Sequence, residues 1–119
     1  MAWTLFTLTG TYHYYGTDFL APGMKLRLVK EPDNLHDREA IRVELPGLGK
    51  IGYVANSPYT VKGESMSAGR LYDRIGDTAR AQVMIVLKDF AICKVCRRSL
   101  VEDSPVSFIL DEDTTEDED

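Results

Sequence analysis

Apolar and polar residues alternate with a period of two along much of the chain. The clearest case is the stretch MKLRLVKE, in which Met24, Leu26 and Leu28 face one way and Lys25 and Arg27 face the other. Alternation of this kind predicts a half-buried β-strand. The exposed face of this strand is basic.

The same alternation recurs in several other segments. The predicted strands are a long first strand over 3–15, a hairpin formed by 39–45 and 50–55, two strands within 79–96 that meet near Lys88, and a last strand at 105–110. Within SAGRLYDRIG, Leu71 and Ile75 recur at helical spacing, with Ser67 as N-cap and Gly76 as C-terminal stop. We therefore expect one short helix among the strands.

Five to seven short strands with one or two helices predict a mainly β fold. The length fits one domain, residues 1–110, built as a small β-barrel of OB-like or SH3-like kind. The large aromatic residues Trp3, Phe6, Phe90 and Phe108 are expected in its core. Gly52 is interpreted as a close-packing or cap position.

Charge is distributed unevenly along the chain. The net charge is -5, but seven acidic residues lie in the last nine positions, and the first 110 residues hold all 14 Lys+Arg against 12 Asp+Glu. Residues 111–119 are therefore predicted to form a disordered acidic tail. Such a tail promotes solubility, or it acts as a phosphate mimic that competes with nucleic acid for the domain's own surface.

Neither a secretory signal nor a membrane span is recognisable in the sequence, which predicts a cytoplasmic protein. Cys93 and Cys96 form a single CxxC without a second pair of ligands, and the segment reads as a strand. We interpret both residues as reduced thiols, and we expect no metal ion and no cofactor.

Four segments, in this order and spacing, resemble the HIRAN domain. They are LTGTYHYYG, PGMKLRLVKEPDNLHDREAIRVEL, KIGYVAN and SAGRLYDRIGDTARAQV, and the resemblance covers roughly residues 5–97. The most specific pattern comprises Glu31, Pro32, Asn34, Asp37, Ala40 and Ile41. The chain resembles the free-standing bacterial form, because it has no ATPase motif such as GxxxxGK[ST] of the SNF2-type remodelling enzymes that carry the domain at their N-terminus.

The resemblance implies a non-catalytic OB-like barrel that captures the 3′ end of single-stranded DNA, in DNA repair or at replication forks. A helicase or nuclease would be a protein partner. Such a pocket needs flat groups to stack on bases, donors for phosphates and an acceptor for the terminal hydroxyl. The candidate nucleic-acid-binding residues are His13, Tyr14, Tyr15, Lys30, Asp33, Asn34, His36, Asp37, Arg38, Lys50 and Tyr53.

Three of these residues have a specific expected role. Tyr14 is a stacking platform, and Asn34 donates to a phosphate or reads a base edge. The Asp37 carboxylate accepts a hydrogen bond from a 3′-hydroxyl and repels a 3′-phosphate. His13 and Asp33 depart from the remodelling enzymes, which have an arginine and an asparagine there, and both changes subtract positive potential.

Other interpretations of the same residues remain open. Asn34 and Asp37 are common in turns, where their side chains bind backbone N–H groups and fix a loop. Asp33, His36, Asp37 and His13 also offer the ligands of a metal-dependent nuclease. A third alternative is a protein-interaction adaptor that docks a partner through an exposed β edge and aromatic side chains.

Overall fold

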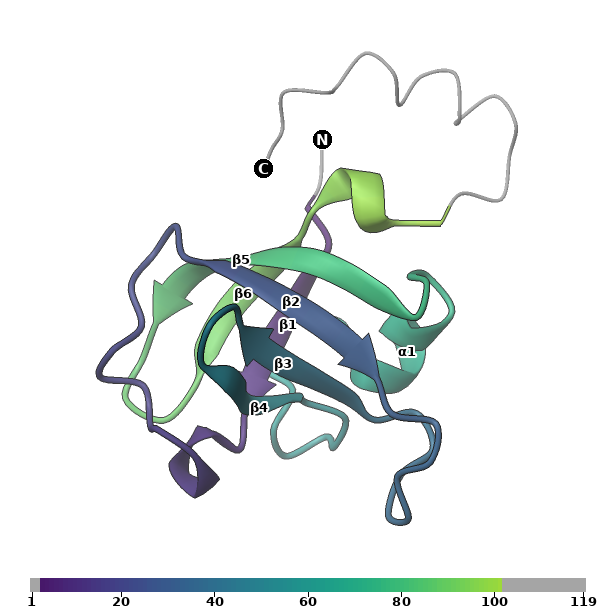
Figure 1. Cartoon of the computed structure of the whole chain (residues 1–119), viewed down its shortest axis with the longest axis horizontal. Helices are drawn as coiled ribbons and strands as arrows, with labels where there is room; N and C mark the ends of the chain where they lie inside the picture. The colour runs from purple at the N-terminus through teal and green to yellow at the C-terminus, as the bar shows by residue number, and fades with distance from the viewer. Residues whose placement is uncertain (1–2, 102–119) are drawn as a thin grey trace.

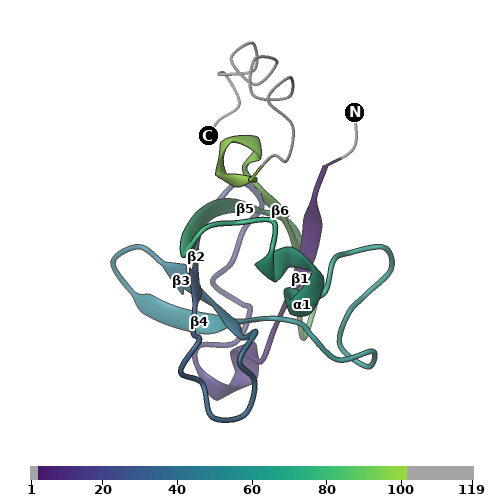
Figure 2. The ribbon, with the colours of Figure 1, turned by 90° about the vertical axis from the view of Figure 1, so that its right-hand side faces the viewer.

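The computed structural model describes residues 3–101, which form a closed antiparallel barrel of six strands. The strands are β1 (Leu5–Thr9), β2 (Lys25–Lys30), β3 (Ile41–Leu45), β4 (Gly49–Val54), β5 (Thr78–Val86) and β6 (Ala91–Val95). Their order around the barrel is β1-β4-β3-β2-β5-β6, and β6 pairs with β1 to close it (Figures 1 and 2). The prediction of a small, mainly β barrel is confirmed.

The alternation in the sequence sets which side of each strand is buried. Leu26 and Leu28 of β2 lie inside with Ile41 and Val43 of β3, while Arg27 points to solvent. The predicted hairpin is the β3–β4 pair, and β5 and β6 are the two strands predicted within 79–96. The barrel interior is thus filled by the apolar half of each alternating segment.

One short helix, α1 (Ala68–Tyr72), packs against the barrel. Ser67 caps it as predicted, because its hydroxyl accepts a hydrogen bond from the Arg70 N–H at 3.2 Å. The expected stop at Gly76 is wrong, since the helix ends at Tyr72 and Ile75 forms a β-bridge with Leu100. Leu71 and Ile75 are nevertheless both buried, as their apolar spacing predicts.

The long first strand predicted over 3–15 is also wrong. β1 ends at Thr9, Gly10 adopts φ +75°, and a 3-10 helix, η1 (Thr11–His13), follows. Tyr12 and Tyr14 are 80% and 38% exposed, so neither belongs to a buried strand face. Glycine at a positive φ is available without steric cost, which explains why the chain turns at this point.

Only some of the aromatic residues expected in the core are buried there. Phe6 is fully buried and Phe90 half-buried, but Trp3 is 54% exposed, with the Lys94 Nζ 4.4 Å from its ring centroid. Phe108, the strand predicted at 105–110 and the acidic tail lie outside the described residues.

A second 3-10 helix, η2 (Arg97–Ser99), follows β6, and both cysteines lie near this junction. Burial raises the pKa of the Cys93 thiol to about 12, which keeps it protonated near neutral pH. Cys96 is buried directly before η2. None of the helices within residues 3–101 has the length and apolar character of a membrane span.

Candidate functional site

Two irregular segments flank the outer face of the β3–β4 hairpin. The 31–40 loop joins β2 to β3, and η1 follows β1; both lie on the lower side of the barrel in Figures 1 and 2. These segments contain the EPDNLHD and TYHYYG stretches that the sequence singled out. The hairpin surface between them is where the candidate residues meet.

Glu31 is the centre of the contacts on this surface. Its Oε1 accepts hydrogen bonds from the Tyr53 hydroxyl and from Nδ2 of Asn34, each at 2.9 Å. Its Oε2 lies 3.5 Å from Nη1 of Arg42 and 3.7 Å from Nζ of Lys50. One half-buried carboxylate therefore connects the loop to both strands of the hairpin.

The protonation states of this cluster are set by those contacts. Burial raises the pKa of Glu31, but hydrogen bonds from Asn34 and Tyr53 and the charge of Lys50 outweigh it, so the pKa is lowered overall. The hydrogen bond to Tyr53 and the Glu31 carboxylate raise the pKa of Lys50 against burial. Glu31 is thus ionised and Lys50 protonated at neutral pH, and each neutralises the other.

Asn34 organises the 31–40 loop. Its side-chain Oδ1 accepts the backbone N–H groups of His36 and Asp37 at 2.8 and 3.0 Å, while its own backbone N–H donates to the Glu31 carbonyl. This is the turn architecture that Asn side chains favour. The interpretation of Asn34 as a loop-fixing residue is confirmed, and its amide is occupied by Glu31.

Asp37 ties the loop to the helix. Its Oδ1 accepts the Glu39 N–H at 2.9 Å, and its Oδ2 accepts Nδ2 of Asn56 at 2.8 Å. Asn56 in turn accepts the Gly69 N–H in the first turn of α1 at 2.8 Å. A carboxylate has about four lone-pair sites, so Asp37 can accept further hydrogen bonds beside its two structural ones.

The aromatic residues around η1 form a separate group. The Tyr12 and His13 rings are 4.0 Å apart, and Tyr15 meets Phe19 edge-on at 6.2 Å. Tyr14 faces the hairpin instead, with Nζ of Lys50 5.5 Å from its ring centroid. Lys50 therefore links the exposed ring of Tyr14 to Glu31 and, through it, to the 31–40 loop.

The candidate residues fall into two groups. Contacts join Tyr14, Lys50, Tyr53, Asn34 and Asp37 into one connected surface. The others lie beside it or are directed elsewhere: His13, Tyr15, Asp33, His36 and Arg38 are exposed around it, and Lys30 is bound on the side of α1. Within residues 3–101 no group of three or more His, Cys, Asp and Glu is placed to hold a metal ion.

Three residues of this surface were not among the sequence candidates. Glu31 was noted only as part of the motif, and Arg42 and Asn56 were not singled out as site residues. Arg42 binds Glu44 through its Nε at 2.6 Å as well as Glu31. Nothing in the sequence pairs these positions, because their contacts arise from strand register and loop packing.

Comparison with known proteins gives one result. Residues 4–58 match the family model of the HIRAN domain. This range covers β1 to β4 and therefore contains η1, the 31–40 loop and the hairpin. The chain has no match among curated proteins or among solved structures.

Proposed function

We propose that this chain, whose residues 4–58 match the HIRAN domain, is a DNA-binding module and binds the 3′-hydroxyl end of single-stranded DNA. In this proposal the protein binds DNA and catalyses no reaction. We further propose that it acts in the cytoplasm in DNA repair or at replication forks, with a helicase or nuclease as protein partner.

The observation that supports this most directly is the chain of contacts from Tyr14 through Lys50 and Glu31 to the Asn34–Asp37 turn. It brings an exposed aromatic ring and a carboxylate with spare acceptor capacity to one surface. Tyr14 stacks on a terminal base, a contact worth about 1 to 3 kcal/mol. Asp37 accepts the terminal hydroxyl and repels a phosphate in its place.

The test is fluorescence anisotropy at low salt with one labelled oligonucleotide that ends in a 3′-hydroxyl or a 3′-phosphate. We expect the chain to prefer the hydroxyl form, and we expect Asp37→Asn to lose that preference. Tyr14→Ala should weaken both forms by a similar factor, about 5- to 150-fold, because stacking does not depend on the terminal group.

Asn56→Ala is the matched control for Asp37→Asn. Asp37→Asn removes one of the two acceptor oxygens that hold the loop, whereas Asn56→Ala breaks the link between the loop and α1 but leaves the carboxylate in place. Preference for the hydroxyl should therefore survive in Asn56→Ala. Equal loss in the two variants would mean that Asp37 acts only by fixing the loop, and unchanged binding in both Asp37→Asn and Tyr14→Ala would refute the proposal.

A protein-interaction adaptor is the second candidate function. Leu35 is 96% exposed at the tip of the 31–40 loop, and Tyr12 and Tyr15 are exposed near η1. Exposed apolar side chains of this kind are typical anchors for a partner. Absence of oligonucleotide binding by a folded chain would favour this function over DNA-end binding.

A further inference from the structure

Three of the four cations in and beside the candidate site are already occupied, and the fourth, Arg38, is exposed and forms no ion pair within residues 3–101. Lys50 lies against Glu31, and Arg42 lies between Glu31 and Glu44. Nζ of Lys30 donates to the Ile75 carbonyl at 2.9 Å and lies 4.3 Å from the Tyr72 ring centroid. Since affinity for nucleic acid depends strongly on cations that neutralise phosphates, this site alone supplies little of it.

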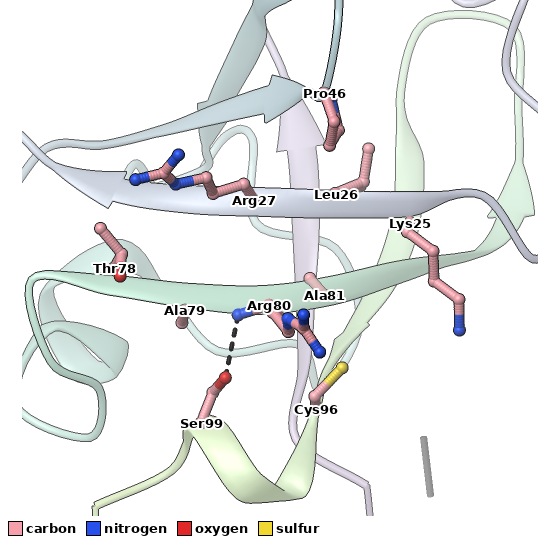
Figure 3. Close-up of a pocket in the computed structure, with 10 residues that line it drawn as sticks. All are labelled: Lys25, Leu26, Arg27, Pro46, Thr78, Ala79, Arg80, Ala81, Cys96 and Ser99. Atoms are coloured by element: carbon pink, nitrogen blue, oxygen red, sulfur yellow. Dashed lines mark hydrogen bonds between the residues drawn. The ribbon is translucent and has the colours of Figure 1, made fainter. Parts of the chain in front are cut away.

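Unneutralised cations lie instead on the outer face of β2 and β5. A groove of about 660 Å³ runs there, and Figure 3 shows Lys25 and Arg27 on β2 and Arg80 on β5. Ala79 and Ala81 are small residues beneath it, and Ser99 of η2 borders it by accepting the Arg80 N–H at 2.9 Å. The groove is therefore basic at its rim, and the hydrogen bond between Arg80 and Ser99 fixes η2 at its border.

The pairing of two arginines in this groove indicates an anionic ligand. Arg27 and Arg80 are directly opposite in the β2–β5 register, and like charges in that position are destabilising. Glu44 is opposite Arg27 on the other side, but its carboxylate binds Arg42 at 2.6 Å. Within residues 3–101 neither Lys25 nor the two arginines form an ion pair, so the groove holds positive charge without a counter-charge.

We propose that this groove binds the backbone phosphates of a single-stranded nucleic acid. η2 adds Arg97 and Arg98 directly after Cys96, which lines the groove. β4, β3, β2 and β5 are successive neighbours in the sheet, so the groove lies two to three strand spacings, about 10 to 15 Å, from Lys50.

The direction of the strand rests on the proposed function, because it assumes that the 3′ end is held at the Tyr14–Asp37 surface. Phosphate binding in the groove does not rest on it. The strand would leave the terminal nucleotide at β4 and cross β3 and β2 toward β5.

The experiment measures binding of a labelled ten-nucleotide oligonucleotide to the full chain as salt is raised. We compare the wild-type chain with Arg27→Gln/Arg80→Gln. The matched control is Arg70→Gln/Lys88→Gln, which removes two exposed cations that do not line the groove. Thermal unfolding of each variant verifies that it is folded.

We expect the groove variant to bind about tenfold more weakly at low salt. The slope of log K against log salt should fall by about 0.7 for each phosphate that the protein no longer neutralises, hence by about 1.4 for the two arginines. The ratio of affinities for the 3′-hydroxyl and 3′-phosphate forms should stay unchanged, because that ratio reports on Asp37. The control variant should change the slope much less.

The outcomes separate the two proposals. A smaller slope in the groove variant, without any 3′-end preference in the wild-type chain, would support the groove and refute the end-binding function. End preference with an unchanged slope in the groove variant would overturn the groove and leave the function standing. The same variants are also titrated with labelled polyglutamate as a model of an acidic protein segment. If the groove variant loses polyglutamate binding while its DNA binding is unaffected, the groove binds an acidic protein segment, and the nucleic-acid proposal is overturned.

Discussion

At the scale of single residues, Glu31 makes the largest number of side-chain contacts in the candidate site. It is 15% exposed at its side chain and contacts the loop and both strands of the hairpin. Substitution therefore removes several interactions at once. The Tyr53 hydroxyl and the Asn34 amide lose their acceptor, Lys50 loses its counter-charge, and Arg42 keeps only Glu44.

The lowered pKa of Glu31 makes its contribution to stability dependent on pH. A carboxylate whose pKa is lower in the folded state stabilises the fold fully above its ordinary value of 4.5. That stabilisation is lost as the pH falls through the folded-state pKa. We expect Glu31→Gln to lower the free energy of unfolding by about 1 to 2 kcal/mol at pH 7, and the difference from wild type to vanish at strongly acidic pH.

Urea unfolding of both proteins between pH 7 and pH 2 measures this difference. Asp33→Asn is the control, because this exposed carboxylate two residues away forms no side-chain hydrogen bond or ion pair within the described part of the chain. It should unfold like wild type throughout. A gap between wild type and Glu31→Gln that stays constant with pH would contradict the electrostatic role of Glu31.

The types of residue at the site could be predicted from the sequence, but several of their roles could not. Asn34 and Asp37 were singled out with both a ligand-binding and a turn-forming interpretation, and the structure confirms the second. Lys30 was expected near the ligand, yet it follows the inward-facing row of Leu26 and Leu28 and ends at Ile75. Contacts between segments distant in sequence depend on register, which alternation alone does not set.

At the scale of elements, the junction between β1 and β4 positions η1. Gly52 of β4 lies under β1, and a Cβ on it would come within 2.6 Å of the Thr9 carbonyl oxygen and 2.8 Å of Cδ1 of Leu8. The interpretation of Gly52 as a close-packing residue is thereby confirmed. β1 can approach β4 this closely only because residue 52 has no side chain.

Gly52→Ala should therefore separate β1 from β4 and displace the η1 segment that carries Tyr14. We expect the free energy of unfolding to fall by about 1 to 3 kcal/mol, the range of an overpacked core, and oligonucleotide binding to weaken at temperatures where the variant is still folded. Gly76→Ala is the control, since its Cβ would meet only the Thr78 carbonyl oxygen, at 3.9 Å. Equal stability of the two variants in urea would show that the junction adapts to the added methyl group.

The strands were predicted from the sequence more accurately than the irregular segments between them. β2 to β6 were predicted because each alternates and buries one face, whereas the segment after Thr9 also alternates aromatic and polar residues but turns away at Gly10. Aromatic residues at spacing two indicate a strand only when one row is buried. Around η1 both rows are exposed, so the pattern there is typical of a binding surface as much as of a strand.

At the scale of the whole molecule, charge is the property that joins the two proposed surfaces. On the surface proposed to bind the DNA end, Lys50 and Arg42 are neutralised by Glu31, whereas the β2–β5 groove carries cations without ion-pair partners within residues 3–101. If both proposals hold, the barrel separates discrimination of the DNA end from attraction of its backbone. Variants of the loop should change selectivity, and variants of the groove should change salt dependence.

The acidic segment 111–119 lies outside the described residues, the last of which is Val101. The Val101 N–H donates to the Arg74 carbonyl at 2.7 Å, directly after η2, which borders the groove. Ten positions later seven acidic side chains begin. A tethered anionic segment competes at an effective concentration near the millimolar range, so we propose that it occupies the same cations as DNA.

Deletion of residues 111–119 should therefore tighten oligonucleotide binding at low salt, and the gain should fade as salt is raised because screening weakens the competition. A chain of the same length with the seven acidic residues changed to Asn and Gln separates charge from length and should behave like the deletion. In Arg27→Gln/Arg80→Gln the gain should shrink, because fewer cations remain for the tail to cover. Equal affinities of the full and shortened chains at low salt would show that the tail does not compete, and the seven charges would then serve solubility alone.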